Sequence, residues 1–163
     1  MCYYFQKSRF VLSLQSNLFK KLLTPYEIVV PKIVSGSTFY FTTESNLKYE
    51  VKFGRKTTNI FHVSIVFGVL DDEFEENEYS LTNRGEVYRI MATLVKVIRY
   101  YIRNHPNVDQ LEFSGEPTND EVDQFGDKRL RLYMRYLKEI FNSNTWRTKQ
   151  FEGKIIVTKN KTD

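Results

Sequence analysis

The segments IFHVSIVFGVL (60–70), EVYRIMATLVKVIRYYIR (86–103) and VDQLEFS (108–114) decide the fold, because their patterns are those of a strand, a helix and a strand. Residues 60–70 are apolar at nearly every position, which is typical of a strand in the centre of a sheet. The helical segment gathers its apolar residues on one face, at Ile90, Met91, Leu94, Val95, Ile98, Tyr101 and Ile102. Two strands joined by such a helix pair in parallel through a right-handed crossover. We therefore expect a mixed sheet with this helix packed against it.

The segments on either side of this unit extend the pattern. The other expected elements are strands at 38–43, 47–54, 146–150 and 154–158 and a helix at 128–141. The second helix also has an apolar face, formed by Leu130, Tyr133, Met134, Leu137, Ile140 and Phe141. From residue 38 the order is β-β-β-α-β-α-β-β. This order predicts a single α+β domain with a mixed central sheet and two long amphipathic helices.

The ends of the chain differ from this core pattern. Residues 9–23 have helical spacing, and residues 26–34 are rich in β-branched side chains but are interrupted by Pro31. We expect residues 1–34 to form an N-terminal extension of one helix and a broken strand. Residues 35–158 then form the domain, and residues 159–163 a frayed polar tail.

Composition limits the classes of protein to which this chain can belong. Its 163 residues include 41% hydrophobic and 15% aromatic side chains, which excludes a mainly disordered chain. A single cysteine and two histidines leave little for a metal site, so we expect no metal. The net charge of +4 does not by itself require a nucleic-acid partner. No apolar stretch has the length of a bilayer span, and no signal-peptide pattern begins the chain. We expect a protein that is neither secreted nor bound in a membrane.

The element order and two short motifs resemble the GNAT family of N-acetyltransferases. The resemblance covers about residues 38–158, with LTNRGEVYR (81–89) before the central helix and Leu132-Tyr133 on the later helix. In that family the turn before the central helix holds the pyrophosphate of acetyl-coenzyme A on backbone amides. A tyrosine on the later helix protonates the departing thiolate. The resemblance therefore implies that Tyr133 is the acid and that the cofactor is held by Asn83, Arg84, Gly85, Val87, Tyr88 and Arg89.

The turn at 81–89 also has a purely structural interpretation. Asn83 and Glu86 have the spacing of a capping box, in which both side chains satisfy free amides of the first helical turn. Gly85 is the one small residue, whereas the family has a second small residue where Val87 or Tyr88 stands. Glu86 also places negative charge where the cofactor phosphates would bind.

The proposed catalytic residues have an alternative as well. Tyr133 lies on the apolar face of its helix, so it also fits a buried tyrosine. The Gly-Phe pair that usually follows in the family is replaced by Leu137 and Lys138. Acetyl transfer also needs a base for the attacking amine, for which the strands offer Glu112 or Glu50.

The segments YSLTNRGEVYRIMATLVKVI and RLRLYMRYLKEIF resemble small proteins of unassigned role that bacteriophage genomes encode. Together with the altered turn, this resemblance favours a non-catalytic protein on an acetyltransferase-like scaffold. Such a protein acts by protein–protein interaction as a virion or assembly component or as a binder of a host factor. It resides in the host cytoplasm or in the virion, and it needs no cofactor. The apolar residues 1–34 are the segment expected to hold a phage or host partner.

Two alternatives remain. The first is an acetyl-coenzyme A-dependent N-acetyltransferase. The second is a nucleic-acid-binding accessory protein, because each helix carries a basic stripe on its polar face. The stripe residues are Arg89, Lys96, Arg99 and Arg103 on the first helix and Lys128, Arg131, Arg135 and Lys138 on the second. Tyr100 and Tyr136 lie near these stripes and could stack on bases if they are exposed.

Overall fold

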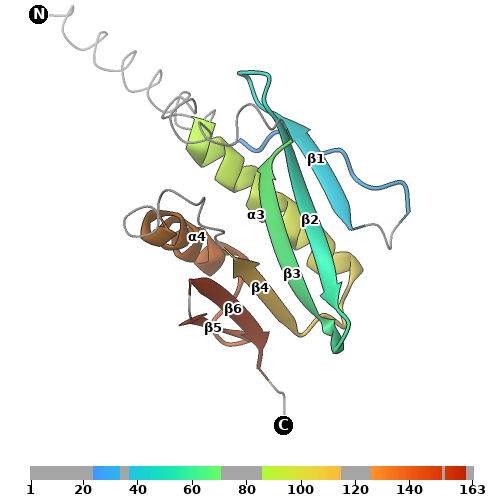
Figure 1. The fold of residues 1–163 in the computed structure, drawn as a ribbon, viewed down its shortest axis with the longest axis vertical. Coiled ribbons are helices and arrows are strands. Elements are labelled where there is room, and N and C mark those ends of the chain that lie inside the picture. The colour runs from blue at the N-terminus through green and yellow to red at the C-terminus, as the bar shows by residue number, and fades with distance from the viewer. Residues whose placement is uncertain (1–23, 34–36, 71–85, 115–125, 152, 161–163) are drawn as a thin grey trace, which may run out of the picture.

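The computed structural model describes residues 24–33, 37–70, 86–114, 126–151 and 153–160, and it has an α+β architecture (Figure 1). The elements in chain order are β1 (Thr38–Thr42), β2 (Lys48–Lys56), β3 (Asn59–Val69), α3 (Glu86–Asn104), β4 (Gln110–Ser114), α4 (Gly126–Ile140), β5 (Trp146–Phe151) and β6 (Lys154–Lys159). The predicted order of strands and helices is confirmed, and the strands form one mixed six-stranded sheet. The helix expected at 9–23 lies outside the described residues.

The parallel pair that the sequence predicts lies at the centre of the sheet. The strand order is β1-β2-β3-β4-β6-β5, and β1 to β3 form an antiparallel meander. The chain then returns through α3, so that β3 and β4 pair in parallel with His62 opposite Gln110 and Ile65 opposite Phe113. β4 pairs antiparallel with β6, and β5 and β6 form the predicted hairpin at the other edge. Gly153 in its turn has a φ of 70°, which glycine adopts without strain.

Two strands run further than the sequence suggests. The polar turn expected at 55–59 is shorter, because β2 continues through Lys56 with a bulge at Arg55/Lys56 that brings Lys56 opposite Asn59. At the other end, β6 includes Lys159, whose amide donates to the carbonyl of Asp109 at 2.7 Å. The amide of Asn160 donates to the carbonyl of Thr145, also at 2.7 Å, so the described end of the chain is held against the domain.

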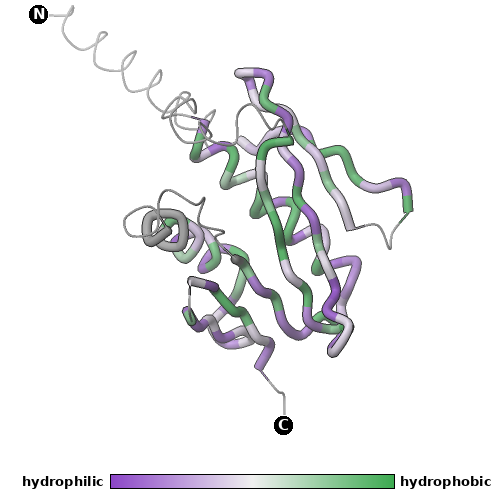
Figure 2. Tube along the Cα trace, viewed as in Figure 1, coloured by the Kyte–Doolittle hydropathy of each residue, from purple (hydrophilic) through white to green (hydrophobic). Residues whose placement is uncertain are grey.

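Both helices pack on the same face of the sheet. In Figure 1, α3 runs behind β2 and β3, and α4 contacts α3. The residues predicted for the inner face of α3 are buried or partly buried in the core. Along the strands in Figure 2, hydrophobic and hydrophilic residues alternate, so that each strand offers an apolar face to the helices. The ring of Tyr101 stacks on Phe53 with centroids 3.8 Å apart and meets Phe39 edge-on. Within the described ranges, neither helix is long and apolar enough to cross a membrane.

The opposite face of the sheet carries no helix among the described residues, and we call it the open face. Strand alternation places Ile60, His62, Ser64 and Val66 of β3 on this face. The side chains of Ile60 and Val66 are 57% and 54% exposed. The prediction that residues 60–70 form a central strand is therefore confirmed. Its apolar residues are nevertheless not buried on both faces, because the two helices lie together on the other side.

Residues 24–33 connect the edge of the sheet to α3. The ring of Tyr26 is buried and stacks on Phe41 with centroids 5.9 Å apart. Its backbone amide donates to Thr93 Oγ1 at 2.8 Å, and that hydroxyl donates to the carbonyl of Arg89 at 2.7 Å. Val29 forms an isolated antiparallel bridge with Tyr40 of β1. The hydroxyl of Thr93 and this bridge thus both hold the described part of the predicted extension to the domain.

We expect Thr93→Val to destabilise the protein through the amide of Tyr26. The substitution keeps the shape of the side chain but leaves this buried amide without its acceptor, which costs about 1–3 kcal/mol. Urea unfolding measures the loss, and hydrogen exchange at the Tyr26 amide identifies its origin.

Thr93→Ser is the matched control, because it keeps the hydroxyl and loses only a methyl group. The Tyr26 amide should stay protected from exchange in this variant and lose protection in Thr93→Val. Equal protection in both variants would contradict the proposed link.

Candidate functional site

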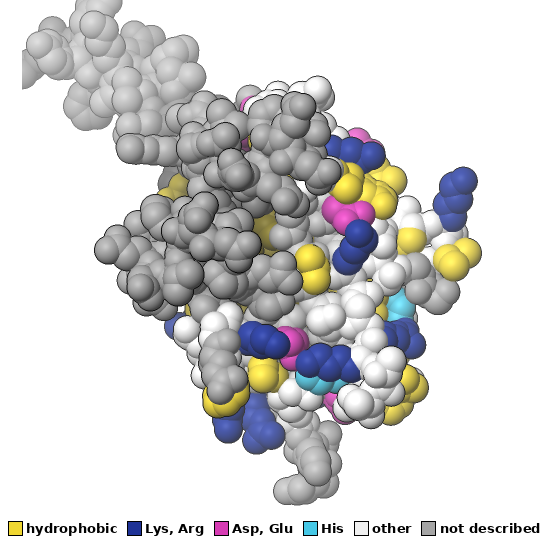
Figure 3. Space-filling view, viewed as in Figure 1, with side chains coloured by type: hydrophobic (Ala, Val, Ile, Leu, Met, Phe, Trp, Pro, Cys, Tyr) yellow, Lys and Arg dark blue, Asp and Glu magenta, His cyan; other side chains and the backbone are white. Residues whose placement is uncertain are grey.

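A buried carboxylate lies in the middle of the open face. Glu112 is on β4 and is only 7% exposed, between Leu111 and Phe113, which point into the core. Its carboxylate accepts hydrogen bonds from Lys56 Nζ at 2.5 Å and from Lys154 Nζ at 3.2 Å. The strands β2, β4 and β6 therefore each contribute one charge to this cluster. Figure 3 looks onto the open face and shows acidic, basic and histidine side chains gathered there.

The electrostatics of the cluster fix its protonation at neutral pH. Burial by itself would raise the pKa of the Glu112 carboxyl, but the hydrogen bonds from Lys56 and Lys154 outweigh burial and hold this pKa below its ordinary value. Burial, together with the charge of Lys56, lowers the pKa of His62 despite the nearby carboxylate. Glu112 is therefore ionised and His62 neutral. A carboxylate with a depressed pKa is a weak acceptor for the proton of an attacking amine.

His62 lies beside this cluster but is not hydrogen-bonded to it. Its Nε2 lies 3.3 Å from Glu112 Oε2 but does not form a hydrogen bond with it. This nitrogen is buried and has no hydrogen-bond partner among the described residues. Over the same residues, no three His, Cys, Asp or Glu side chains gather as a ligand set for a metal ion.

The side chain of Glu86, in the first turn of α3, ties the helix to a neighbouring turn of the chain. Glu86 accepts hydrogen bonds from the amide of Ser45 at 3.0 Å and from Ser45 Oγ at 2.6 Å. These bonds join α3 to the turn between β1 and β2, and the negative charge at this end of the helix is favoured by the helix dipole. Asn83, the partner of Glu86 in the predicted capping box, lies outside the described residues, as do Arg84 and Gly85.

Arg89 is held by contacts with the protein itself. Its Nε donates to the carbonyl of Thr24 at 2.8 Å, and one terminal nitrogen pairs with Glu44 Oε1 at 2.6 Å. The guanidinium also lies 4.1 Å from the centre of the Tyr26 ring. Of the other residues expected to bind the cofactor, Val87 is half-buried and Tyr88 is exposed. Arg89 therefore links the extension to the β1–β2 turn.

The two residues expected to be catalytic do not meet. Tyr133 of α4 is half-buried on the helix-covered face, where it lines a small internal space together with Phe113. Glu112 is the neighbour of Phe113 and points to the opposite face of the same strand. One substrate could not contact both side chains, because β4 lies between them. Glu50, the other candidate base, pairs with Lys52 at 2.6 Å on the open face.

The basic stripes lie on the helix side. Lys96, Arg99 and Arg103 of α3 and Arg135 and Lys138 of α4 are exposed. The guanidinium of Arg99 donates to the carbonyl of Glu139, so the two stripes meet where the helices pack. For Lys128 and Arg131 the structure gives the backbone only.

Of the two tyrosines beside these stripes, one is exposed and one is buried. Tyr136 is buried in the core, and burial raises the pKa of its hydroxyl. Tyr100 is 38% exposed, although one edge of its ring packs against Phe39 with ring centroids 5.8 Å apart.

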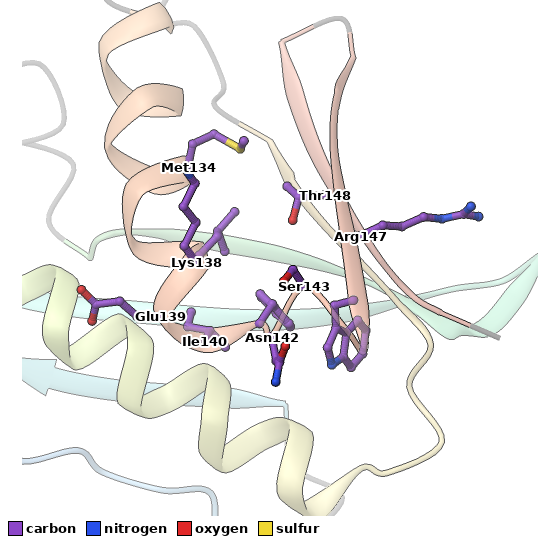
Figure 4. A pocket seen from close by; sticks show the side chains of 11 residues that line it. Met134, Lys138, Glu139, Ile140, Asn142, Ser143, Arg147 and Thr148 are labelled. Carbon is purple, nitrogen blue, oxygen red and sulfur yellow. The ribbon is translucent and has the colours of Figure 1, made fainter. Parts of the chain in front are cut away.

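Sequence reasoning missed a cleft of about 840 Å³ between the end of α4 and β5. Figure 4 shows Met134 and Lys138 of α4 on one side and Thr148 of β5 on the other, while Arg147 points away. Trp146 lines the cleft and packs on Phe141 with ring centroids 5.1 Å apart. An apolar floor with a polar rim suits an inserted side chain or small ligand. The only sequence signal that could have indicated this cleft is Trp146, the single tryptophan of the chain.

Comparisons with known proteins do not place the chain in a family. No protein-family model matches the sequence, and no curated protein matches it.

We expect Glu112→Gln to lower the free energy of unfolding at neutral pH by about 1–3 kcal/mol, because it removes charge-assisted hydrogen bonds to Lys56 and Lys154. A carboxyl whose pKa is lower in the folded than in the unfolded state stabilises the fold above its unfolded pKa. This stabilisation is lost as the pH falls towards the folded pKa. The difference between wild type and variant should therefore shrink as the pH falls below the ordinary carboxyl pKa of 4.5.

Glu50→Gln provides the control on the same face, because its partner Lys52 is exposed and solvent screens the pair, so the loss of stability should be much smaller. Urea unfolding at several pH values measures both variants. A deficit of Glu112→Gln that stays constant with pH would contradict the ionised state of this carboxylate.

Proposed function

We propose that this protein is a non-catalytic binding protein on an acetyltransferase-like scaffold, of the type that bacteriophage genomes encode. It acts through protein–protein interaction, as a virion or assembly component or as a binder of a host factor. The observation that carries the proposal is a strip of exposed aliphatic side chains beside β1. Val29, Val30 and Ile33 form this strip, and Val29 and Ile33 are 61% and 66% exposed.

The strip lies in the segment that the sequence favours for partner binding. Residues 24–33 run beside β1 in Figure 1, and Val29 makes a single bridge to this edge strand. Pro31 has no amide to donate, so the segment does not extend the sheet. Aliphatic side chains exposed next to one another mark contact surfaces more often than single exposed residues do. An apolar surface on the protein partner would cover them.

The scaffold part of the proposal is supported by topology. An antiparallel meander, a parallel pair joined by α3 and a C-terminal hairpin occur in the order that the resemblance implies. Fold alone does not imply activity. Three further observations favour a non-catalytic role. Tyr133 of α4 and Glu112 of β4 lie on opposite sides of the sheet, and the pKa of Glu112 is depressed. Arg89 is engaged by Thr24 and Glu44.

We expect no change in melting temperature when the full chain is titrated with acetyl-coenzyme A or coenzyme A. A ligand that binds the native state stabilises it by about 2.7 kcal/mol at one hundred times its dissociation constant, so binding is readily seen in a thermal-shift assay. A clear shift would instead support the N-acetyltransferase alternative. In that case Gly85→Glu should abolish the shift, and Tyr133→Phe should abolish acetyl transfer while the shift remains.

We expect Val29→Asp combined with Ile33→Asp to release the protein partner, because a charge at each position opposes burial of the strip. Affinity capture with the tagged full chain, from cells in which it is made, followed by mass spectrometry measures this release. The matched control is Lys32→Asp, which adds negative charge to the same segment without touching its aliphatic residues. Deletion of residues 1–34 is less informative, because it also removes the buried ring of Tyr26.

A partner retained equally by the double variant and by wild type would contradict the assignment of this strip. Loss of the partner in Lys32→Asp to the same extent would show that added negative charge, and not loss of the aliphatic surface, releases the partner, and would also contradict this assignment.

A further inference from the structure

We propose that the open face of the sheet binds single-stranded nucleic acid. This site is distinct from the aliphatic strip beside β1 and does not depend on the proposed protein partner. It also differs from the basic helix stripes that the sequence suggests, because it lies on the other side of the sheet.

Charge is the first observation. Strand alternation places on the open face the cations Lys48, Lys52, Arg147, Lys149 and Lys154 and the carboxylates Glu50 and Glu112. Lys56 follows the bulge of β2 and is placed on this face by its bond to Glu112. Lys52 pairs with Glu50, and Lys56 and Lys154 share Glu112. Arg147 and Lys149 are exposed and have no ion-pair partner among the described residues. The cations thus outnumber the carboxylates even after every pair is formed.

The distribution of these cations suits a chain of phosphates. Lys48, Lys52 and Lys56 follow β2 across the face, and Arg147 and Lys149 follow β5 at the opposite edge of the sheet. Asp109, just before β4, is the further acid near His62 at one end of the face. Figure 3 shows that Lys and Arg side chains predominate over Asp and Glu on this side. Such a surface attracts a polyanion and releases its counterions on binding.

An exposed aromatic ring is the second observation, and it favours a nucleic acid over an acidic protein. Phe151 is 61% exposed. It lies on the same face of β5 as Arg147 and Lys149, at every second position, and opposite Lys154 of β6. A phenylalanine ring that is open to solvent and flanked by cations can stack on an unpaired base while the cations meet its phosphates. Bases of a single strand can reach such a ring, whereas those of a duplex are stacked inside the helix.

The aromatic rings predicted for the helix side are less open to solvent than Phe151. Tyr136 is buried, and Tyr100 is 38% exposed, against 61% for Phe151, because its ring packs edge-on against Phe39. Arg99 is bonded to the carbonyl of Glu139, which adds a carboxylate to that surface. This contrast provides a matched control within the same chain.

The test measures binding of a fluorescein-labelled oligothymidylate to the full chain by fluorescence anisotropy at several salt concentrations. Wild type should bind, with an affinity that falls steeply as salt rises. Arg147→Glu combined with Lys149→Glu should weaken binding at least about tenfold and reduce the salt slope by about 0.7 for each cation removed. Phe151→Ala should weaken binding at least about fivefold while leaving the salt slope unchanged.

Lys96→Glu combined with Arg103→Glu makes the same change in net charge on the helix side and should bind like wild type. Circular dichroism verifies that each variant is folded. Absence of binding by wild type at low salt would overturn the proposal, and so would equal losses in the two charge-reversed variants. Displacement of the oligonucleotide by polyglutamate at matched charge would also overturn it, since the face would then bind an acidic chain of any kind. Tighter binding of the duplex form than of the single strand would overturn the assignment to single strands.

Discussion

Burial of the apolar face of α3 against the sheet is the interaction on which the rest of this structure depends. After β3 the chain runs back along the sheet as α3, packed on one face, and then enters β4 in the same direction as β3. This crossover makes β3 and β4 parallel neighbours. Tyr101 fixes the helix by stacking on Phe53, and Thr93 fixes the segment that precedes β1 through the amide of Tyr26. Once α3 is in place, β4 has β3 on one side and can accept β6 on the other.

Because α4 packs on the same side as α3, the sheet has two chemically different faces. The covered face holds the aromatic and aliphatic core, including the half-buried Tyr133. The open face holds charges that pair where strands bring them together, and Glu112 is their centre because its neighbours in space come from β2, β3 and β6. Cations at the β5 edge remain without ion-pair partners among the described residues. The same asymmetry separates residues that acetyl transfer would require on one side.

The start of α3, where the resemblance places a cofactor site, has structural partners instead. Glu86 and Arg89 both lie near the start of α3, and both reach out of the helix, to Ser45 and to Glu44 in the turn between β1 and β2. A carboxylate in the first turn is favoured by the helix dipole, which explains why a negative charge is stable at a place that also suits phosphate. The first turn of α3 thus anchors the hairpin, and the adjoining extension leaves Val29 and Ile33 exposed.

The sequence by itself determined the order of elements, the parallel crossover and the inner face of α3, because hydrophobic periodicity is local information. It also indicated Glu112 and the basic residues, and it identified residues 1–34 as an added apolar segment. It could not determine that β6 lies on the other side of β4, or that Lys56 of β2 reaches across β3, so the ion pairs of Glu112 with Lys56 and Lys154 could not be predicted. Nor could it assign both helices to one face, which exposes Val66 and buries Tyr136. Only the tertiary structure decided these points, because they depend on contacts between segments far apart in the chain.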